Sequence, residues 1–351
     1  MNKKIIKAAA ALLVLFLCLL GCETKGTDGQ KDPKKEKIDY TGTLRVYNAG
    51  EYIDKTVLDD FEREFLIKVV YDEFESNEEM YAQISEFPDS YDILVPSDYM
   101  IDRLIQEGRL EKLDKEKIKN IGHVAEQYKN PAYDADNSYS VPYMVGTLGI
   151  LYSKKYAAGA DSWEVLFDRG RRDKILMLDS QRDVIGLALK MLGSDLNSGR
   201  EGELSQVKSK LQEMGFVYGE SETIRDLMVA GEGAFGVVYS GDAKTAIDRN
   251  PDLAYAIPKE GSNKWLDAFV IVKGAPNMEA AQQFIDFMCR PNIAVRNMTK
   301  TGYTSPIKGA WSEFGGNAVM FPSDEELGRC EAFLYDAEAA VKYERLWNEV
   351  Y

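Results

Sequence analysis

The chain has 351 residues, enough for two domains that each bury a core of their own. Its formal net charge is −15, in a composition that is globular and carries no signature of disorder. This acidic surplus disfavours nucleic acid as a partner, because phosphate binding depends on Lys and Arg. A cationic ligand is compatible with the charge, although an acidic surface that only keeps a protein soluble gives the same composition.

The N-terminus has the pattern of a lipoprotein signal. Three lysines within the first seven residues precede an apolar run over residues 8–20, which is too short to span a membrane as a helix. The run ends in LLGC, which resembles the bacterial lipobox, so we expect removal of residues 1–21 and acylation of Cys22. An ordinary cleaved signal with a chance cysteine is the alternative. The polar segment 22–41 then forms a flexible tether on a membrane surface.

Strand and helix patterns alternate through the first half of the mature chain. Runs rich in β-branched and aromatic residues favour strands, and apolar residues three and four apart favour helices. Strands separated by helices of this length predict parallel pairing in an open α/β sheet. The predicted elements are strand 44–48, helix 56–65, strand 67–74, helix 78–84, strand 92–96 and helix 99–107.

The same alternation resumes after Pro142. Ser162 is expected to cap a short helix over residues 162–168, and Asn277 to cap a longer helix over residues 277–290. No internal repeat is evident, which removes solenoid folds. The other predicted elements are strands 174–179, 216–218, 234–239 and 265–273, and helices 183–192, 204–214, 222–230 and 337–349.

Motifs that suggest enzyme chemistry stand in the wrong context. Residues 231–236 match GxGxxG, but a dinucleotide site needs these glycines after a strand and before a helix, whereas here they end a helix and lead into a strand. His123 is the only histidine, which disfavours a zinc site or a histidine-activated nucleophile. We therefore expect no catalytic residue, metal or cofactor. Cys289 and Cys330, left after processing, either pair or remain as two buried thiols.

Acids and aromatic residues gather where predicted strands give way to turns. The carboxyl ends of strands form the ligand site in open α/β sheets, although any one aromatic is more often a core residue. A polyamine suits such a set, because its methylene chain needs flat apolar walls and each ammonium needs a carboxylate or a ring face. The segments are 49–52, 96–99, 178–183, 238–242 and 265–267, with 301–303 in addition.

The sequence resembles the spermidine/putrescine-binding proteins of bacterial ABC importers over residues 42–351. Among the blocks that carry the likeness, in order, are VYNAGEYID, YDILVPSDYM, YSVPYMVGTLGI, ILMLDSQRD and WLDAFVIVK. The resemblance implies an α/β fold of the two-lobed, type II periplasmic-binding-protein kind. Its sheets would be open and mostly parallel, with a hinge and a ligand cleft between the lobes. Lobe 1 would comprise residues 42–150 and 268–312, and lobe 2 residues 151–267 and 313–351.

The resemblance also implies the ligand contacts. Ala49 replaces a tryptophan wall, and Ser180 replaces an aspartate of the spermidine branch. Asp242 matches an acid of the putrescine branch, while Glu331 stands where the spermidine branch has a glutamine, so the choice between the two ligands stays open. The implied contacts are Glu51, Tyr52, Ser97, Tyr99, Asp183, Tyr239, Asp242, Trp265, Asp267, Tyr303 and Glu331.

By this likeness the protein is an extracytoplasmic receptor that binds spermidine or putrescine without chemistry. Its expected partners are the permease and ATPase subunits of an ABC importer, and a membrane reached through the acylated Cys22. One alternative is a lipoprotein of the same fold for another organic cation or ferric ion, and another is a polyamine sensor that feeds no transporter. Trp265 beside Asp267 favours an organic cation over ferric ion, whose sites favour paired tyrosines.

Overall fold

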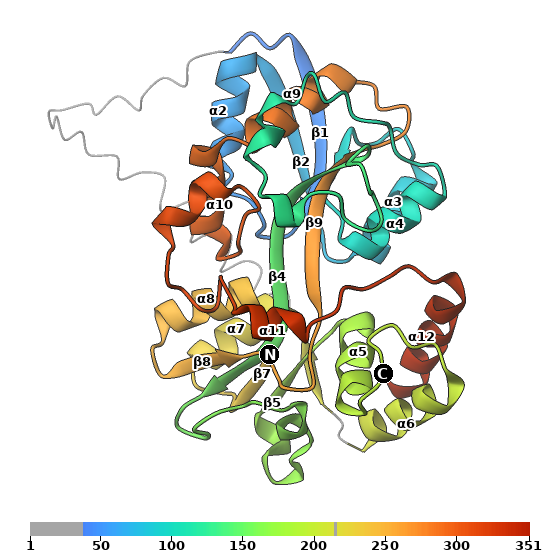
Figure 1. Cartoon of the computed structure of the whole chain (residues 1–351), viewed down its shortest axis with the longest axis vertical. Helices are drawn as coiled ribbons and strands as arrows, with labels where there is room; N and C mark the ends of the chain where they lie inside the picture. The colour runs from blue at the N-terminus through green and yellow to red at the C-terminus, as the bar shows by residue number, and fades with distance from the viewer. Residues whose placement is uncertain (1–37, 214–215) are drawn as a thin grey trace, which may run out of the picture. The chain divides into compact units, whose positions relative to one another are not determined.

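A nine-stranded sheet organises residues 39–351 in the computed structural model, which describes residues 38–213 and 216–351 (Figure 1). The strand order is β2-β1-β3-β9-β4-β7-β5-β6, and β8 pairs with β4. The strands are β1 (Gly42–Ala49), β2 (Ile67–Phe74), β3 (Ile93–Leu94), β4 (Ser140–Ser153), β5 (Ile175–Leu178), β6 (Val217–Gly219), β7 (Phe235–Tyr239), β8 (Leu253–Ala256) and β9 (Lys264–Ile271).

Helices connect and cover these strands. The α-helices are α2 (Thr56–Phe65), α3 (Asn77–Glu86), α4 (Asp98–Gln106), α5 (Gln181–Met191), α6 (Glu201–Gln212), α7 (Ser221–Val229), α8 (Ser240–Arg249), α9 (Met278–Met288), α10 (Pro291–Thr301), α11 (Asp324–Gly328) and α12 (Ala337–Val350). None of the helices in the described ranges is long and apolar enough to cross a membrane.

The sheet has two parallel groups joined by two crossing strands. β1 pairs in parallel with β2 and β3, and β5 pairs in parallel with β6 and β7, which confirms the pairing predicted from the alternation. The ladders made by β4 and β9 are antiparallel instead. β4 and β9 run side by side from one group to the other (Figure 1). The expected two-lobed fold with crossing strands is confirmed.

Each lobe has its own hydrophobic core. We call the first the β1 lobe, whose core includes Phe61, Phe284 and Phe287, with ring centroids of Phe61 and Phe284 5.1 Å apart. The second, the β7 lobe, packs Trp163 and Tyr343 among the apolar faces of α5, α6, α7 and α12. The lobe boundaries given above by residue number stay a prediction.

Two glycines let the long strand β4 pass close to aromatic rings. A Cβ atom at Gly146 would lie 2.4 Å from Cζ2 of Trp265, its neighbour on β9, and one at Gly149 would lie 2.5 Å from the ring of Tyr255. A side chain at either position would force the ring to move. These glycines, with Pro142, interrupt the strand pattern, which is why the sequence did not predict β4 as one element.

The structure departs from two of the capping expectations and confirms the turn at Gly231. Ser162 caps as expected, its Oγ accepting from the Glu164 amide at 3.2 Å, but the segment that follows is the 3₁₀ helix Trp163–Phe167 and not an α-helix. Asn277 precedes α9 without capping it, because its side-chain amide donates to Asp92. Gly231 has a φ of 80° between α7 and β7, so the predicted helix-to-strand order of the GxGxxG segment is confirmed.

The one histidine and the two cysteines of the described residues lie among structural contacts and not in the cleft. His123 lies in the 3₁₀ helix Lys119–His123, with its Nδ1 3.2 Å from the carbonyl oxygen of Cys289. Cys289 and Cys330 are both buried free thiols. Over residues 38–213 and 216–351, no group of three His, Cys, Asp or Glu side chains is placed to hold a metal.

Candidate ligand-binding cleft

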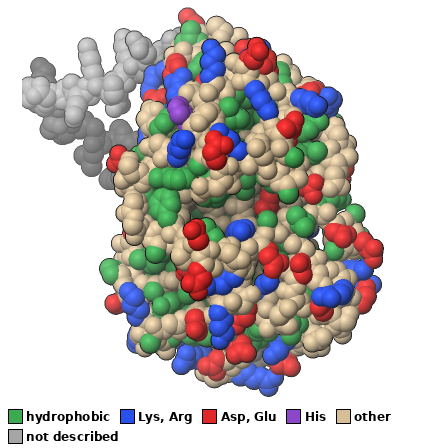
Figure 2. Space-filling view, viewed as in Figure 1, with side chains coloured by type: hydrophobic (Ala, Val, Ile, Leu, Met, Phe, Trp, Pro, Cys, Tyr) green, Lys and Arg blue, Asp and Glu red, His purple; other side chains and the backbone are tan. Residues whose placement is uncertain are grey.

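A cleft of about 1130 Å³ opens where the two lobes meet. Residues at the ends of β1, β3, β5 and β7 line it, together with residues of β9. Figure 2 shows the surface hollowed in this place, with acidic and basic side chains along the rim. The carboxyl ends of strands therefore meet at one site, as expected for an open α/β sheet.

Ten of the residues expected from the sequence line this cleft, and one does not. Glu331 forms an ion pair with Lys190, and its other carboxylate oxygen accepts from the Leu196 amide at 2.9 Å. Glu331 therefore ties the segment between α11 and α12 to α5 and to the loop after α5, and it does not line the cleft. Cys22, the expected acylation site, lies outside the described residues. The ten that line the cleft are Glu51, Tyr52, Ser97, Tyr99, Asp183, Tyr239, Asp242, Trp265, Asp267 and Tyr303.

Asp267 lines the cleft and has one buried oxygen without a hydrogen-bond donor within the described ranges. The residue is 9% exposed, and its Oδ2 accepts from the Tyr52 hydroxyl at 2.7 Å. Its Oδ1 is buried and has no hydrogen-bond partner within the described ranges. Burial raises the pKa of Asp267 to about 6. An ionised but only half-satisfied carboxylate in this setting favours a cationic donor as ligand.

Asp183 lies at the start of α5 and is held by neutral donors. Its Oδ2 accepts from Ser180 Oγ at 2.7 Å and from the Tyr239 hydroxyl at 2.8 Å, and its Oδ1 accepts from Asn263 Nδ2 at 3.3 Å. Burial raises its pKa, and these donors offset part of that rise. The other side-chain atom of Asn263, Oδ1, is a buried acceptor with no partner within the described ranges. Sequence reasoning missed Asn263, although it stands two positions before Trp265.

Aromatic rings surround these acceptors. The ring centroid of Trp265 lies 5.2 Å from that of Tyr303 and 6.2 Å from that of Tyr239, in both cases edge to face. Tyr52 lies 5.3 Å from Tyr303 in the same kind of arrangement. Edge-to-face packing leaves ring faces turned to different sides of the cleft, where they can cover methylene groups or cations.

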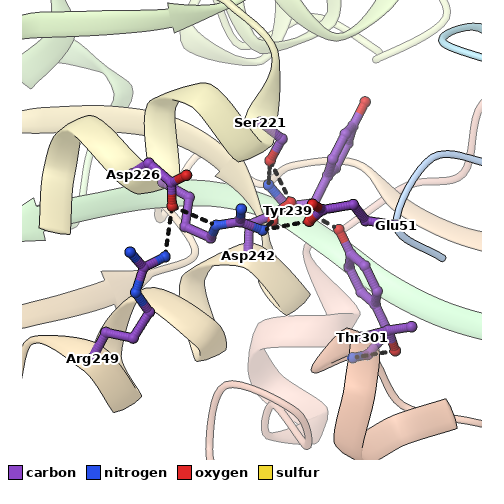
Figure 3. A network of polar contacts seen from close by, with 9 residues as sticks. Glu51, Ser221, Asp226, Tyr239, Asp242, Arg249 and Thr301 are labelled. Carbon is purple, nitrogen blue, oxygen red and sulfur yellow. Dashed lines mark hydrogen bonds and ion pairs between the residues drawn. The ribbon is translucent and has the colours of Figure 1, made fainter. Parts of the chain in front are cut away.

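The Asp242 side of the cleft holds a guanidinium that the sequence did not point to. Asp242 accepts from Arg225 Nη1 at 2.9 Å, from Ser221 Oγ at 2.7 Å and from the Tyr303 hydroxyl at 3.1 Å. The same Arg225 nitrogen lies 3.2 Å from Glu51 Oε2, which belongs to the β1 lobe (Figure 3). Burial raises the pKa of Asp242, and Ser221 and Arg225 counteract the rise. Every oxygen of Asp242 therefore has a donor before any ligand arrives.

The Tyr99 side of the cleft is also occupied by an arginine. The Arg182 guanidinium lies 4.2 Å from the centroid of the Tyr99 ring and donates to the Leu334 carbonyl oxygen at 3.1 Å. The Tyr99 hydroxyl donates to Glu78 at 3.0 Å, and Ser97 Oγ accepts from Asn77 at 3.1 Å. Tyr99 and Ser97 are thus engaged by side chains of the protein itself.

Comparisons with known proteins show which proteins the chain is similar to. The family profile of the bacterial extracellular solute-binding proteins matches residues 56–317. The spermidine/putrescine-binding periplasmic protein of Salmonella typhimurium is 30% identical over 321 residues, which cover 88% of this chain and 91% of that protein. The putrescine-binding periplasmic protein of Escherichia coli is 30% identical over 294 residues, covering 76% and 79%.

A solved structure shows the same architecture. It comes from Listeria monocytogenes, from a protein assigned to a spermidine/putrescine ABC transporter, and it superposes with a TM-score of 0.83 at 36% identity. The match covers 88% of this chain and 98% of that one. The resemblance expected from the sequence is confirmed over most of its length.

Proposed function

Because the chain belongs to the bacterial extracellular solute-binding proteins, we propose that its cleft captures a polyamine, spermidine or putrescine, and presents it to an ABC importer. The observation that carries the proposal is a pair of buried acceptors, Asp267 Oδ1 and Asn263 Oδ1, without partners within the described ranges. Each unsatisfied buried acceptor costs about 1–3 kcal/mol. A ligand that brings donors removes this cost on binding.

The charge of two cleft acids, Asp183 and Asp267, selects the kind of donor. Neither Asp183 nor Asp267 takes part in an ion pair within residues 38–213 and 216–351, and both are at least nine-tenths buried. An alkylammonium supplies three donors and a positive charge and brings no acceptor that needs a partner of its own. A neutral sugar or an anion would leave one or both carboxylates without a counter-charge. A primary amine therefore fits the two acids best.

The aromatic residues suit the rest of a polyamine. Its methylene groups need apolar cover, and Trp265, Tyr303, Tyr52 and Tyr239 provide ring surfaces next to both acids. Ring faces also stabilise ammonium groups that approach them. Capture needs no covalent step, so we propose that the protein acts by binding alone.

Calorimetric titration of the purified full chain in detergent tests the proposal. Putrescine or spermidine should bind with a dissociation constant of about 10 μM or lower, equivalent to about 6.8 kcal/mol. The matched control is 4-aminobutyrate, which has four carbons like putrescine but ends in a carboxylate in place of one aminomethyl group. It should bind at least about a hundred-fold more weakly, because its carboxylate would face Asp183 or Asp267. Equal binding of the two, or no binding of any amine, would overturn the proposal.

We further propose that the protein is anchored through lipid on Cys22. The basic, apolar and LLGC segments of residues 1–22 support this, as does the need to hold a receptor close to a permease. Cys22→Ser should release the protein from the membrane fraction or leave residues 1–21 attached, as mass spectrometry would show. A Cys22→Ser protein that is processed and still fractionates with membranes contradicts the anchor.

Delivery to an importer is tested separately from binding. Cells that express the protein with a cognate permease and ATPase should accumulate labelled putrescine, and loss of the receptor should abolish the uptake at low putrescine concentration. A sensor would bind the amine in calorimetry but would leave uptake unchanged. The two outcomes separate an import receptor from a polyamine sensor of the same fold.

A further inference from the structure

We propose that Arg225 is a built-in counter-ion that takes the place of a third ligand ammonium and restricts the cleft to diamines. The inference rests on the proposed polyamine function and names which polyamine the cleft prefers. The starting observation is that the acids of the cleft fall into two groups. Asp183 and Asp267 have no cationic partner within the described ranges, whereas Asp242 and Glu51 share the Arg225 guanidinium.

Asp242 has no room for another cation. Its Oδ1 accepts from Arg225, and its Oδ2 accepts from both Ser221 and Tyr303. The side chains of Asp242 and Arg225 are only 8% and 12% exposed, so their interaction is poorly screened by water. A ligand ammonium that displaced Arg225 from Asp242 would leave the guanidinium buried without that partner, so the exchange gains nothing.

Arg225 is itself held from several sides. Its Nε lies 3.1 Å from Asp226, and Asp226 also pairs with Arg249 Nη1 at 2.6 Å (Figure 3). Glu51 completes the set from the β1 lobe, with a left-handed φ of 51° that non-glycine residues rarely adopt. The guanidinium is thus fixed between α7, α8 and the turn after β1, and is not a mobile surface group.

The acids that remain beside Arg225 are poor sites for a third ammonium. The Glu51 side chain is 61% exposed, and an ion pair in that setting contributes little to affinity. Burial and the neighbouring Asp242 raise the pKa of Glu222 to about 7, which leaves this acid partly protonated at neutral pH. Two desolvated acids without a cation are left, Asp183 and Asp267, which match the two charges of putrescine or cadaverine.

The other end of the cleft offers no third position. Arg182 covers one face of the Tyr99 ring at 4.2 Å, so a second protein cation stands where the ligand would extend. Asp98, the residue before Tyr99, is 4% exposed, and burial raises its pKa to about 8, which leaves it mostly neutral. The carboxylate that lines this end, Glu78, is exposed and already accepts from the Tyr99 hydroxyl at 3.0 Å, so a third ammonium would gain little from it and would be repelled by Arg182.

Titration of the full chain with putrescine, cadaverine and spermidine tests the inference. The unmodified protein should bind the two diamines at least about ten-fold more tightly than spermidine. Arg225→Ala frees Asp242 and Glu51, so it should shift the spermidine-to-putrescine affinity ratio toward spermidine by at least about ten-fold. Arg249→Ala removes one guanidinium from the same cluster but leaves Asp242 and Glu51 paired, so it should change the ratio by less than about two-fold.

Each outcome separates the inference from the proposed function. Binding of spermidine as tight as that of putrescine by the unmodified protein overturns the role of Arg225 and leaves polyamine capture intact. Absence of binding for all three amines overturns polyamine capture itself. Should Arg225→Ala not fold, Arg225→Gln keeps a donor near Asp242 without the charge and should shift the ratio in the same direction. An equal shift in Arg249→Ala would show that only the net charge of the cleft matters, which also overturns the inference.

Discussion

The two acidic ends of the cleft differ in what satisfies their carboxylates. At the Asp242 end, side-chain donors of the protein already reach both oxygens, and a guanidinium supplies the charge. At the Asp267 end, one oxygen has the Tyr52 hydroxyl and the other has no partner within the described ranges. Both acids are buried next to aromatic rings, so residue type and burial alone do not separate them. The donors that each acid already has indicate which one is left for a ligand.

Asp267→Asn should give the largest loss of binding. Asn keeps the shape of the side chain and the hydrogen bond from Tyr52 but removes the charge that an ammonium needs. Loss of one partner of a buried charge pair costs about 2–5 kcal/mol, so the dissociation constant for putrescine should rise about a hundred-fold, or about 2.7 kcal/mol. Calorimetry measures it, with Asp226→Asn as a control for loss of one acid from an exposed position. A change below about ten-fold would place the ligand elsewhere in the cleft.

The second largest effect should come from lowering the pH, which should weaken putrescine binding about ten-fold between pH 7 and pH 5. Burial raises the pKa of Asp267 to about 6 in the ligand-free protein, and a bound ammonium favours the ionised form. The affinity is therefore nearly complete above about pH 7, is about halved near pH 6 and falls about ten-fold for each further pH unit. Titrations with putrescine over this interval measure the slope. Asp267→Asn should flatten the profile, and an unchanged slope in that variant would assign the pH dependence to another group.

The stability of the ligand-free protein should depend on pH in the opposite direction. Burial raises the pKa of both Asp267 and Asp98 above their ordinary values, to about 6 and about 8. The folded protein then binds more protons than the unfolded chain between about pH 4 and pH 8, so its free energy of unfolding rises as the pH falls from 8 to 5.5. Acids whose pKa is lowered, such as Glu62, are ionised in both states over this interval. Thermal unfolding without ligand checks the direction, and a lower Tm at pH 5.5 contradicts it.

A pair of tyrosine variants should show a smaller difference between the two ends. Tyr52→Phe removes the hydroxyl that donates to Asp267 at 2.7 Å, and Tyr303→Phe removes one that donates to Asp242 at 3.1 Å. In Tyr52→Phe, Asp267 loses the tyrosine hydroxyl that donates to it. In Tyr303→Phe, Asp242 keeps Arg225 and Ser221 as donors. We expect putrescine binding to weaken about five-fold in Tyr52→Phe and about two-fold or less in Tyr303→Phe. Equal losses in calorimetry would show that the two ends do not differ.

Glu331→Gln should leave binding nearly unchanged. Its carboxylate contacts Lys190 and the Leu196 amide and does not line the cleft. Loss of the charge should lower the free energy of unfolding by about 1 kcal/mol, with a change in the dissociation constant below about two-fold. Urea unfolding and calorimetry on the same sample measure both quantities. A selective loss of spermidine binding would restore Glu331 to the ligand contacts implied by the sequence.

The fold was predictable where local signals and tertiary structure agree. Helix Thr56–Phe65 and strand Ile67–Phe74 have the predicted bounds, because Leu66 between them adopts the left-handed conformation that ends the helix. The helix Ser240–Arg249 was missed because it begins with Ser, Gly and Asp, which favour turns when read alone. Packing on the β7 lobe overrides that preference.

The site was predictable in its aromatic and acidic residues but not in its charge balance. Asp183 follows strand β5, where ligand residues are expected, Trp265 and Asp267 lie in the first half of β9, and the family resemblance points to all three. Arg225 lies in the middle of a predicted helix, where an arginine is usually a solvated surface residue. Its partners Asp242 and Glu51 are 17 and 174 positions away, so no local pattern joins them. Which acids are already neutralised becomes visible only in three dimensions.

The glycine at position 146 has a consequence for how the ligand specificity of this receptor can evolve. A Cβ atom there would lie 2.4 Å from Cζ2 of Trp265. The indole can therefore keep its position in the cleft only because residue 146 on the neighbouring strand has no side chain. Gly146→Ala would tilt the indole without replacing any residue that faces the ligand. Natural variants with a changed ligand specificity should therefore be sought among sequences that differ at Gly146, as well as among those that differ at the cleft acids.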